Sequence, residues 1–552
     1  MTDKEQVFGI DLGTTYSVIA FINDFGQAEV IRNREGEETT PSVVYFESAT
    51  SFVVGKEAKN EIVAHHDATV SLIKRSMGTD FPLQFFGTEF RPESISALIL
   101  KDLVEFAQQA TGIDTNKVAI TVPAYFGRGE TAATRQAAEI AGLEVVGIIT
   151  EPVAAALSVG VTGDKAETLF VYDLGGGTFD CTVLEFSPGT GDSSGATSGT
   201  VMEVLAIDGH RSLGGADWDQ RLFELVKAKF IAQAGLGDED PTEDEDFVQK
   251  LTNEVEDLKK SLSRKEKAGA SLRYGDVALK VEVTRAEFET ATRTLVDQTL
   301  DIVRRTLATA QQKRPDLKLE EVLLVGGSSK MPMIQASLEN EMGWSLRKTD
   351  LDLAVAKGAA IYGQGISLRP PTPTPVGGTD DTGTEERKLA PDVIIFNGEE
   401  LEIRNALSRS LGLRWVRESA AVPGEWEHFI GFVAHQQESL PLRRPFTGFA
   451  AQDNTTNLTI RIYEQISGVE DENPKSNTEV TPTSGATLTN LPNLPAHSAI
   501  EFELSISSQG EAQLSAFEPI SNQRIDLPIT LSVMQAADVA KAKQAVEGMV
   551  RA

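Results

Sequence analysis

The sequence has very little that would cross-link it, anchor it in a membrane or attract it to polyanions. Its 552 residues include one cysteine, Cys181, which excludes a disulfide within the chain and indicates a reducing compartment. Acidic residues outnumber basic ones by 82 to 51, and a net charge of −31 repels nucleic acid and anionic lipid. The N-terminus shows no basic and apolar leader. The longest apolar neighbourhood, 145–161, contains Glu151 and Pro152, so we expect it to be a buried helix and not a membrane span. We therefore expect a cytoplasmic protein with no nucleic-acid and no membrane partner.

The first two thirds of the chain alternate between strand-like and helix-like patterns. Hydrophobic residues make up 40% and charged residues 24% of the chain, which is ordinary globular composition. Short β-rich runs at 7–10, 18–22 and 118–122 are interspersed with helical periodicity at 94–109 and 129–141. This alternation predicts an α/β domain over residues 1–366.

The composition changes after residue 366. Residues 367–391 are rich in proline and glycine, which predicts a linker. From 392 to 533 short runs alternate apolar and polar residues between turn signals, which predicts an all-β sandwich. Residues 534–552 are rich in Ala, Lys, Val and Glu, and they predict one short helix that cannot bury a core alone.

A short pattern of acid, glycine and hydroxyl residues occurs twice after a β run. The first copy is Asp11-Leu12-Gly13-Thr14-Thr15, and the second is Asp173-Leu174-Gly175-Gly176-Gly177-Thr178. Glycine lets the backbone turn tightly and approach a phosphate, whose oxygens accept from the turn N–H groups and the Thr hydroxyls. The two Asp carboxylates are suited to Mg²⁺ through its coordinated waters. One such motif is usually just a turn, whereas two copies predict facing hairpins that bind a nucleoside triphosphate, and no P-loop motif competes with them.

These motifs resemble the seventy-kilodalton heat-shock chaperones of DnaK type, which are built on the actin-like ATPase fold. The resemblance also rests on residues 121–126, 151–157, 213–217 and 324–332, which follow the family's order and cover most of residues 8–366. It implies a duplicated, two-lobed α/β domain that binds ATP or ADP with Mg²⁺ and hydrolyses ATP slowly. K⁺ is a further candidate ligand.

The resemblance also implies individual site residues. Lys74 matches the lysine that orients the attacking water and stabilises charge on the transferred phosphoryl, and Glu151 matches a carboxylate near the metal. From the local sequence alone, Lys74 would be a surface lysine and the charges at 256–263 a solvated helix face. The implied catalytic residues are Lys74, Glu151, Asp173, Thr178 and Asp11, with Asp180 beside them, and Asp11 and Asp173 hold the metal through water. The implied nucleotide-binding residues are Gly13, Thr14, Thr15, Tyr16, Gly175, Gly176, Gly177, Glu256, Lys259, Lys260, Ser263, Gly326, Gly327, Ser328, Lys330 and Asp352.

The C-terminal half resembles the family's peptide-binding sandwich, which implies that unfolded or extended polypeptide is the partner. A hydrophobic groove for such a peptide would be lined by Leu413, Val416, Phe449, Leu458 and Ile460, although each of them fits an ordinary sandwich core as well. Pro123 and Arg135 match the relay between the nucleotide site and this domain, and a nucleotide-exchange factor is a further implied partner.

Three departures from the family pattern keep a second function open. Residues 534–552 are too few for the family's helical lid, and the linker is longer and richer in Pro and Gly than usual. Gly147 stands where relatives carry a basic residue used by J-domain partners, which leaves cooperation with a J-protein undecided. An ATP-dependent chaperone is the prediction, and a nucleotide-gated scaffold for a specific folded partner is the alternative. A small-molecule kinase and an actin-like filament are weaker alternatives, because no sugar-binding signature is found and the charge of −31 opposes self-association.

Overall fold

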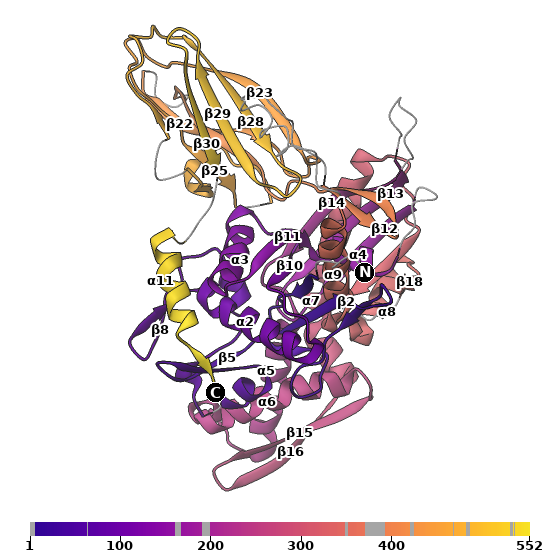
Figure 1. Ribbon diagram of the computed structural model, residues 1–552. Coiled ribbons are helices and arrows are strands. Elements are labelled where there is room, and N and C mark those ends of the chain that lie inside the picture. Colours follow the sequence, from indigo (N-terminus) through magenta and orange to yellow (C-terminus); the bar gives the residue numbers. More distant parts are fainter. Residues whose placement is uncertain are drawn as a thin grey trace.

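The computed structural model describes residues 6–62, 64–160, 167–189, 199–347, 352–369, 392–419, 424–466, 468–481, 486–529, 534 and 536–552. Two lobes of mixed sheets and helices form the body, and a β-sandwich domain lies at one end of it (Figure 1). Most of the expected linker, residues 370–391, lies outside the described residues.

Lobe I is built on a six-stranded sheet. Its order is β11-β10-β1-β2-β3, with β4 paired to β2, and β1 runs antiparallel to β2 and parallel to β10. The helices α2 and α3 pack against the sheet and against each other, with the apolar stripes of both helices in one buried cluster. The elements are β1 Phe8–Asp11, β2 Tyr16–Ile22, β3 Ala28–Val30, β4 Thr40–Pro41, β10 Lys117–Val122, β11 Glu144–Thr150, α2 Pro92–Thr111 and α3 Arg128–Ile140.

Smaller elements complete lobe I beside this sheet. The strands β5, β6 and β7 form a separate sheet, which α1 contacts, and β8 pairs with β9 in a hairpin. Their bounds are β5 Val44–Ser48, β6 Ser51–Val54, β7 Thr69–Val70, β8 Leu83–Phe85, β9 Thr88–Phe90 and α1 Lys56–Glu61.

Lobe II repeats the central pattern of lobe I. Three antiparallel strands, β12-β13-β14, are joined on the β12 side by the parallel strand β17, as β10 joins β1 in lobe I. This repetition confirms the predicted duplicated α/β fold. The elements are β12 Glu167–Leu174, β13 Phe179–Pro188, β14 Thr200–His210, β15 Lys267–Tyr274, β16 Val277–Thr284, β17 Glu321–Val325, β18 Leu346–Arg347, α4 Glu151–Ser158, α5 Gly215–Ala234, α6 Glu245–Leu262, α7 Arg285–Lys313, α8 Pro332–Met342 and α9 Ala354–Ser367.

Two helices connect the lobes at their centre. Helix α9 packs on β1 and β2 of lobe I and also on α4. The contact is close because Gly9 and Gly358 have no side chains: a Cβ on Gly9 would lie 2.0 Å from Ala360 N, and one on Gly358 would lie 1.7 Å from Ala154 O. The apolar neighbourhood at 145–161, expected as a buried helix, consists of strand β11 followed by α4.

The sandwich domain consists of two four-stranded antiparallel sheets. Their orders are β22-β21-β25-β26 and β23-β28-β29-β30, and the alternating apolar residues of both sheets meet in one core, as the period-two pattern predicts. The elements are β21 Leu411–Glu418, β22 Trp426–Ala434, β23 Leu442–Phe449, β24 Leu458–Thr459, β25 Ile462–Gln465, β26 Asn477–Glu479, β27 Thr487–Leu488, β28 Ala499–Ile506, β29 Ala512–Glu518 and β30 Gln523–Ile529.

The structure departs from the sequence-based expectation at both ends of the sandwich. Strands β19 (Asp392–Phe396) and β20 (Glu399–Arg404) do not belong to it, because β20 pairs in parallel with β14 and extends the lobe II sheet to seven strands. Helix α11 (Ala536–Glu547) lies along α2 and α3 of lobe I, and the chain then forms a strand, β31 (Val550–Arg551), on β6 (Figure 1). Edge strands and helix faces that lie far apart in sequence meet here, which local patterns do not encode. No helix in the described part of the chain is long and apolar enough to cross a membrane.

Candidate nucleotide site between the lobes

The two Asp–Gly turns face each other across the junction of the lobes. A Cβ on Gly176 would lie 2.0 Å from Thr15 Oγ1, and one on Gly177 would lie 2.3 Å from Thr14 Cγ2. The turn after β12 is therefore in direct contact with the turn after β1, and only glycine fits at these two positions. The backbone closes the second turn with a hydrogen bond from Gly175 N to Thr178 O of 3.1 Å. The facing arrangement expected from the repeated motif is present.

Four carboxylates gather beside these turns. Asp173, Asp180 and Glu151 are each less than a tenth exposed, and Asp11 accepts a 3.3 Å hydrogen bond from Thr121 Oγ1. Burial and the nearby Glu151 carboxylate raise the pKa of Asp11 to about 7, and the same two causes raise the pKa of Asp180 well above its usual range. Burial, Glu151 and Asp11 do the same for Asp173. The cluster therefore holds more negative charge than its protein surroundings compensate.

Lys74 is the cation within this cluster. It lies on the short 3-10 helix Ile73–Ser76, is 6% exposed, and donates a hydrogen bond of 2.5 Å to Glu151 Oε1. Burial alone would lower the pKa of Lys74, but Glu151 and Asp11 raise it, so the ammonium is charged. The next residue, Arg75, donates to Gly177 O at 2.8 Å and pairs with Asp217 at 3.1 Å, which links lobe I to the second turn.

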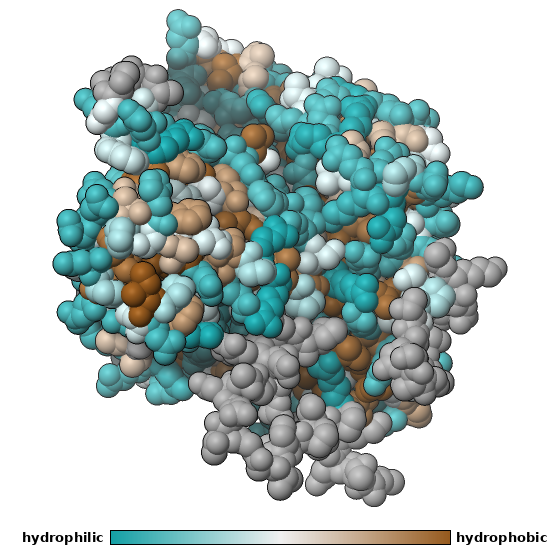
Figure 2. Space-filling model, turned by 90° about the horizontal axis from the view of Figure 1, so that it is seen from above, coloured by the Kyte–Doolittle hydropathy of each residue, from teal (hydrophilic) through white to brown (hydrophobic). Residues whose placement is uncertain are grey.

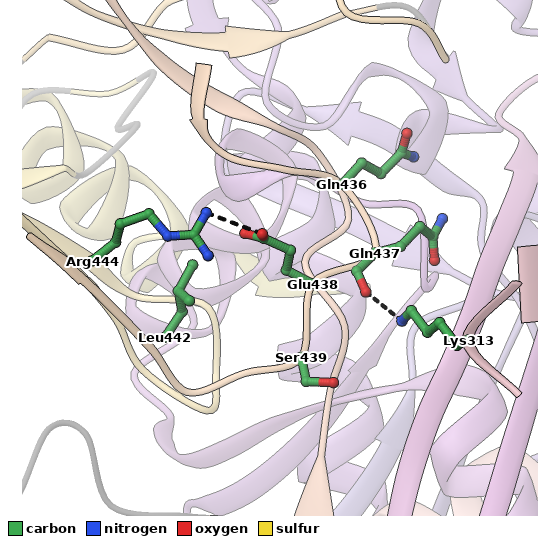
Figure 3. A pocket seen from close by; sticks show the side chains of 7 residues that line it. All are labelled: Lys313, Gln436, Gln437, Glu438, Ser439, Leu442 and Arg444. Carbon is green, nitrogen blue, oxygen red and sulfur yellow. Dashed lines mark hydrogen bonds and ion pairs between the residues drawn. The ribbon is translucent and has the colours of Figure 1, made fainter. Parts of the chain in front are cut away.

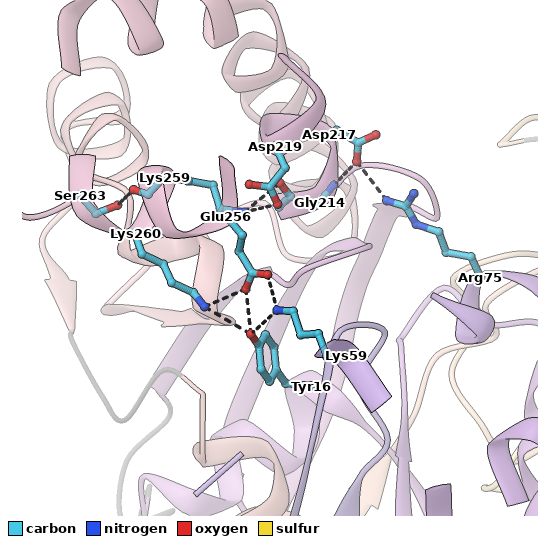
Figure 4. Close-up of polar contacts among 11 residues, drawn as sticks. Tyr16, Lys59, Arg75, Gly214, Asp217, Asp219, Glu256, Lys259, Lys260 and Ser263 are labelled. Atoms are coloured by element: carbon cyan, nitrogen blue, oxygen red, sulfur yellow. Dashed lines mark hydrogen bonds and ion pairs between the residues drawn. The ribbon is translucent and has the colours of Figure 1, made fainter. Parts of the chain in front are cut away.

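The expected adenosine-side residues on α6 are engaged in contacts across the lobes (Figure 4). Tyr16 donates to Glu256 Oε1 at 2.8 Å, Lys260 pairs with Glu256 at 2.7 Å, and Lys59 pairs with the same carboxylate. Lys59 and Lys260 also lie 5.3 Å from the Tyr16 ring centroid, at cation–π distance. Sequence reasoning missed Lys59, because it lies on α1, far from either motif.

Lys259 and Ser263 face other partners on α5 and α6. Lys259 donates to Gly215 O at 3.0 Å and pairs with Asp219 at 2.7 Å, whereas Ser263 Oγ donates to Lys259 O at 3.1 Å. Lys259, on the face of α6 expected to bind the nucleotide, thus contacts the first turn of α5.

The glycine turn after β17 completes the site from lobe II. Gly326 has a φ of +80°, and a Cβ there would lie 2.6 Å from Asp173 Oδ1, so this turn packs directly on the second hairpin. A Cβ on Gly327 would lie 3.0 Å from Asp352 Oδ1, and Lys330 pairs with Asp352. Ser328 lies 2.4 Å from the Cβ position of Gly215. The residues expected at 326–330 and 352 therefore lie together.

The segment between Pro123 and Arg135 connects this site to the sandwich domain. Both are positioned by lobe I: buried Pro123 directly follows β10, and Arg135 lies on α3. The contacts themselves are made not by these two side chains but by Phe126, the last residue of the motif at 121–126, and by residues outside the motifs. Ser408 Oγ donates to Phe126 O at 2.8 Å, and buried Glu130 accepts from both Arg409 and Arg211 at 2.7 Å.

A second contact joins the sandwich to lobe II through the loop after β22 (Figure 3). The Gln437 side chain accepts from Ile207 N at 2.9 Å and donates to Ile207 O at 2.6 Å, so its amide pairs with β14 as a neighbouring strand would. Lys313 on α7 donates to the Gln437 backbone carbonyl. The pocket beside this contact is lined by Lys313, Gln436, Gln437, Glu438, Ser439, Leu442 and Arg444.

The residues expected in a peptide groove are divided between core and surface. Leu413 is 4% and Ile460 3% exposed, and both lie in the sandwich core, as the alternative interpretation held. Phe449 is 59% exposed and Val416 36%, whereas Leu458 is half-buried. Seen from the sandwich end, the surface is mainly hydrophilic with separate hydrophobic patches (Figure 2).

Gly147 has no room for the basic side chain that the resemblance led us to compare with it. A Cβ there would lie 2.7 Å from Tyr362 Cε1 and 2.9 Å from Ile366 Cδ1. Tyr362 in turn donates to Asp392 Oδ2 at 2.7 Å, at the first residue of β19. Helix α9 and its contact with β19 therefore occupy the space at this position.

Two lobes of one strand pattern, with facing Asp–Gly turns at their junction, define the actin-like ATPase fold. The family model for the Hsp70 protein matches residues 7–86 and 82–370, so the chain belongs to the Hsp70 family. This confirms the resemblance inferred from the motifs.

Named relatives extend the similarity into the sandwich domain. The chaperone protein DnaK of Thermosipho melanesiensis is 40% identical over 366 residues, which cover 65% of this chain and 59% of that protein. DnaK of Thermotoga petrophila is 35% identical over 479 residues, covering 85% of this chain and 72% of the relative. DnaK of Halobacterium salinarum strain R1 is 33% identical over 478 residues, which cover 85% of this chain and 67% of that protein. The chain thus spans less than two thirds of the Thermosipho relative's length.

Proposed function

We propose that this chain is an ATP-dependent chaperone that hydrolyses ATP slowly and uses the nucleotide state to change its affinity for unfolded or extended polypeptide. Residues 1–366 would form the ATPase domain, whose lobe II sheet is extended by β19 and β20 at 392–404, with 367–391 as the linker and the sandwich at 411–529 as the substrate module. The observation that carries the proposal is the buried Lys74–Glu151 pair beside Asp11 and Asp173, at two facing glycine turns. Membership of the Hsp70 family and the names of the DnaK relatives support it.

The donor set of the site fits Mg²⁺ with a triphosphate. Asp11, Asp173 and Asp180 offer hard carboxylate oxygens whose raised pKa values reflect uncompensated negative charge, and Asp180 Oδ1 is buried with no hydrogen-bond partner among the described residues. In the described part of the chain no three His, Cys, Asp or Glu side chains are arranged to hold a metal directly. Binding of Mg²⁺ through water and phosphate is consistent with both facts.

The chain's own residues would act mainly by positioning and charge. Mg²⁺, when bound, neutralises charge on the phosphate oxygens. The turn N–H groups of Gly13–Thr15 and Gly175–Gly177 would hold the phosphates from both lobes. Lys74, kept charged and oriented by Glu151, would stabilise negative charge on the transferred phosphoryl, and Thr178 would donate a hydroxyl near it. Glu256, Lys260, Gly326–Ser328, Lys330 and Asp352 would bind the nucleoside side.

The partners and the compartment belong to the same proposal. The exposed Phe449 and Val416 side chains would contact the polypeptide, whereas Leu413 and Ile460 would support them from the core. We place the protein in the cytoplasm because its one cysteine indicates a reducing compartment. A nucleotide-exchange factor and a J-protein are candidate partners, although Gly147 removes one basic contact for the latter.

The test is the affinity for a labelled, extended, leucine-rich peptide, measured by fluorescence anisotropy in saturating ATP and in saturating ADP. The expected result is weaker binding in ATP. The Lys74→Ala variant should still bind ATP but not hydrolyse it, so in ATP its affinity for the peptide should stay low. The control variant Lys318→Ala, at an exposed position, should behave as the wild type. If the peptide binds in neither nucleotide, the proposal is contradicted, and the alternative function, a scaffold for a folded partner, remains.

A further inference from the structure

The C-terminal segment Met534–Ala552, here named the clasp, is built into lobe I. Its helix α11 presents Val539, Ala542 and Val546 at helical spacing to the lobe I core, and Met549, just after the helix, joins the same core. Val546 is 1% and Met549 3% exposed, so these side chains are as buried as the core they join. The sequence predicts a short helix that cannot bury a core alone, and lobe I supplies the core against which α11 packs.

Polar contacts hold the clasp to lobe I at its start and near its end. Gln136 donates to Met534 O at 3.3 Å at the start, and Lys101 donates to Val546 O at 3.2 Å and to Met549 O at 3.1 Å at the end of α11. These last two bonds satisfy carbonyls that a helix end leaves free.

The final residues add a strand to a lobe I sheet. Val550 N donates to Thr50 O at 2.9 Å and Ala552 N to Phe52 O at 3.0 Å, so β31 extends the sheet of β5, β6 and β7. Arg551 contacts Asp102 Oδ1 at 2.5 Å. The Asp102 side chain is 2% exposed and also pairs with Arg34, so removal of Arg551 would uncover a buried ion cluster.

The sandwich is therefore attached to both lobes by short connections. Five residue steps separate Ile529, the end of β30, from Met534, which is 4% exposed in the lobe I core, and such a chain spans at most about 18 Å. At its other end, seven steps separate Arg404 of β20, on the lobe II sheet, from Leu411 of β21. A sandwich held in this way has little freedom to move away from the ATPase domain.

We propose that the clasp is permanent: residues 534–552 stay on lobe I and keep the sandwich docked in the ATP and the ADP state alike. Nucleotide-dependent changes in polypeptide affinity then arise while the domains remain in contact. The inference uses the proposed nucleotide binding only to define the two states that are compared.

Hydrogen exchange of the full chain tests the clasp directly. The amides of Val550 and Ala552 should exchange at least about tenfold more slowly than unpaired amides, equally in ATP and in ADP. Peptides covering 11–15 and 173–178 report in the same experiment whether nucleotide is bound. Protection at the hairpins without any change at the clasp supports the proposal, and loss of clasp protection in either nucleotide overturns it. If no nucleotide protects the hairpins, the proposed function fails, and the clasp is judged by the cross-link below.

A cross-link tests whether the clasp has to open. Ser51 and Val550 are directly opposed in the β6–β31 register, and Cys181 is fully buried, so the double variant Ser51→Cys/Val550→Cys places one reactive pair at the clasp. Oxidised and reduced protein should have the same radius of gyration by small-angle scattering in every nucleotide state. A reduced protein that expands in one nucleotide, while the oxidised one does not, would overturn the proposal. Val550→Cys alone controls for the substitution.

A variant that weakens the strand gives the complementary result. Val550→Pro removes the N–H that bonds to Thr50 O, whereas Val550→Ala keeps it. Val550→Pro should lose the slow exchange of Ala552 and increase the radius of gyration, and Val550→Ala should do neither. Unchanged exchange at Ala552 in Val550→Pro would contradict the role of the strand.

Discussion

Lys74 Nζ lies 2.5 Å from Glu151 Oε1 at the junction of the two lobes, and both side chains are less than a tenth exposed. Lys74 is the cation that compensates buried Glu151, whereas the charge of Lys74 is also stabilised by Asp11 and Asp180. Removing Lys74 leaves Glu151 buried without its cation, whereas removing Glu151 leaves Lys74 beside the remaining carboxylates.

We therefore predict strong coupling between these two residues. Lys74→Ala should lower the free energy of unfolding by about 3 kcal/mol and Glu151→Ala by less, because Lys74 keeps Asp11 as a partner, while the double variant should lose clearly less than the sum. Urea unfolding of the four proteins measures the coupling. If the losses in free energy are additive, the two side chains do not stabilise each other. Lys318→Ala, at an exposed site, is the neutral control.

The glycines of the second turn give a prediction about nucleotide binding. Gly177→Ala places a Cβ 2.3 Å from Thr14 Cγ2 and must push the two turns apart, whereas the Cβ of Gly175→Ala has its nearest neighbour, Thr178 O, at an ordinary 3.6 Å. We expect Gly177→Ala to weaken ATP binding at least about tenfold, equivalent to about 1.4 kcal/mol, and Gly175→Ala to change it less than threefold. Isothermal titration with ATP and Mg²⁺ checks this. Equal effects of the two substitutions would show that the contact between the turns is irrelevant to binding.

Local motifs predicted those parts of the site that lie within one turn. The residues Asp11–Thr15 and Asp173–Thr178 carry their own strand, glycines and hydroxyls, so their hairpins could be inferred from the sequence, and the duplicated fold follows from their repetition. The expected helix at 129–141 likewise lies within one residue of α3 at each end. Chemistry that is encoded in consecutive residues is visible in one sequence.

Contacts between distant edges could not be predicted. Lys59 meets Glu256 only because α1 and α6 face each other across the lobes, and nothing in either segment indicates the other. Strand β20 alternates apolar and polar residues as a sandwich strand would, so its sequence does not show that it pairs with the edge strand β14 of lobe II. The composition of 534–552 predicts a short helix, but the surface that covers its Val546 belongs to lobe I, where α11 contacts α2 and α3.

The cluster around Glu256 should make closure of the lobes dependent on acidity. Burial alone would raise the pKa of Glu256, but Lys59 and Lys260 lower it to about 2 from 4.5. A lowered carboxyl pKa stabilises the folded protein at every pH above 4.5, and this contribution disappears as the pH falls from 4.5 to about 2.

The matched variant for this effect is Glu256→Gln. With the carboxylate about a quarter exposed, we expect it to be about 2 kcal/mol less stable than the wild type above pH 5, and the difference to vanish towards pH 2. Denaturant unfolding at a series of pH values measures the difference. A gap that stays constant down to pH 2 would mean that the ionised carboxylate contributes nothing.

Gln437 offers a prediction about the contact between the sandwich and lobe II. Its side chain satisfies both the N–H and the carbonyl of Ile207 on β14, and Gln437→Ala leaves these two backbone groups without that partner. Loss of two such hydrogen bonds should cost about 1–3 kcal/mol of stability and speed exchange of the Ile207 amide. Gln436→Ala, in the same loop and lining the same pocket, is the control and should change neither. If the Ile207 amide exchanges equally slowly in both variants, another group protects it, and the strand-like pairing of Gln437 is not what holds this side of the sandwich. Because the clasp holds the other side independently, Gln437→Ala should not increase the radius of gyration, which separates the loss of one contact from undocking of the domain.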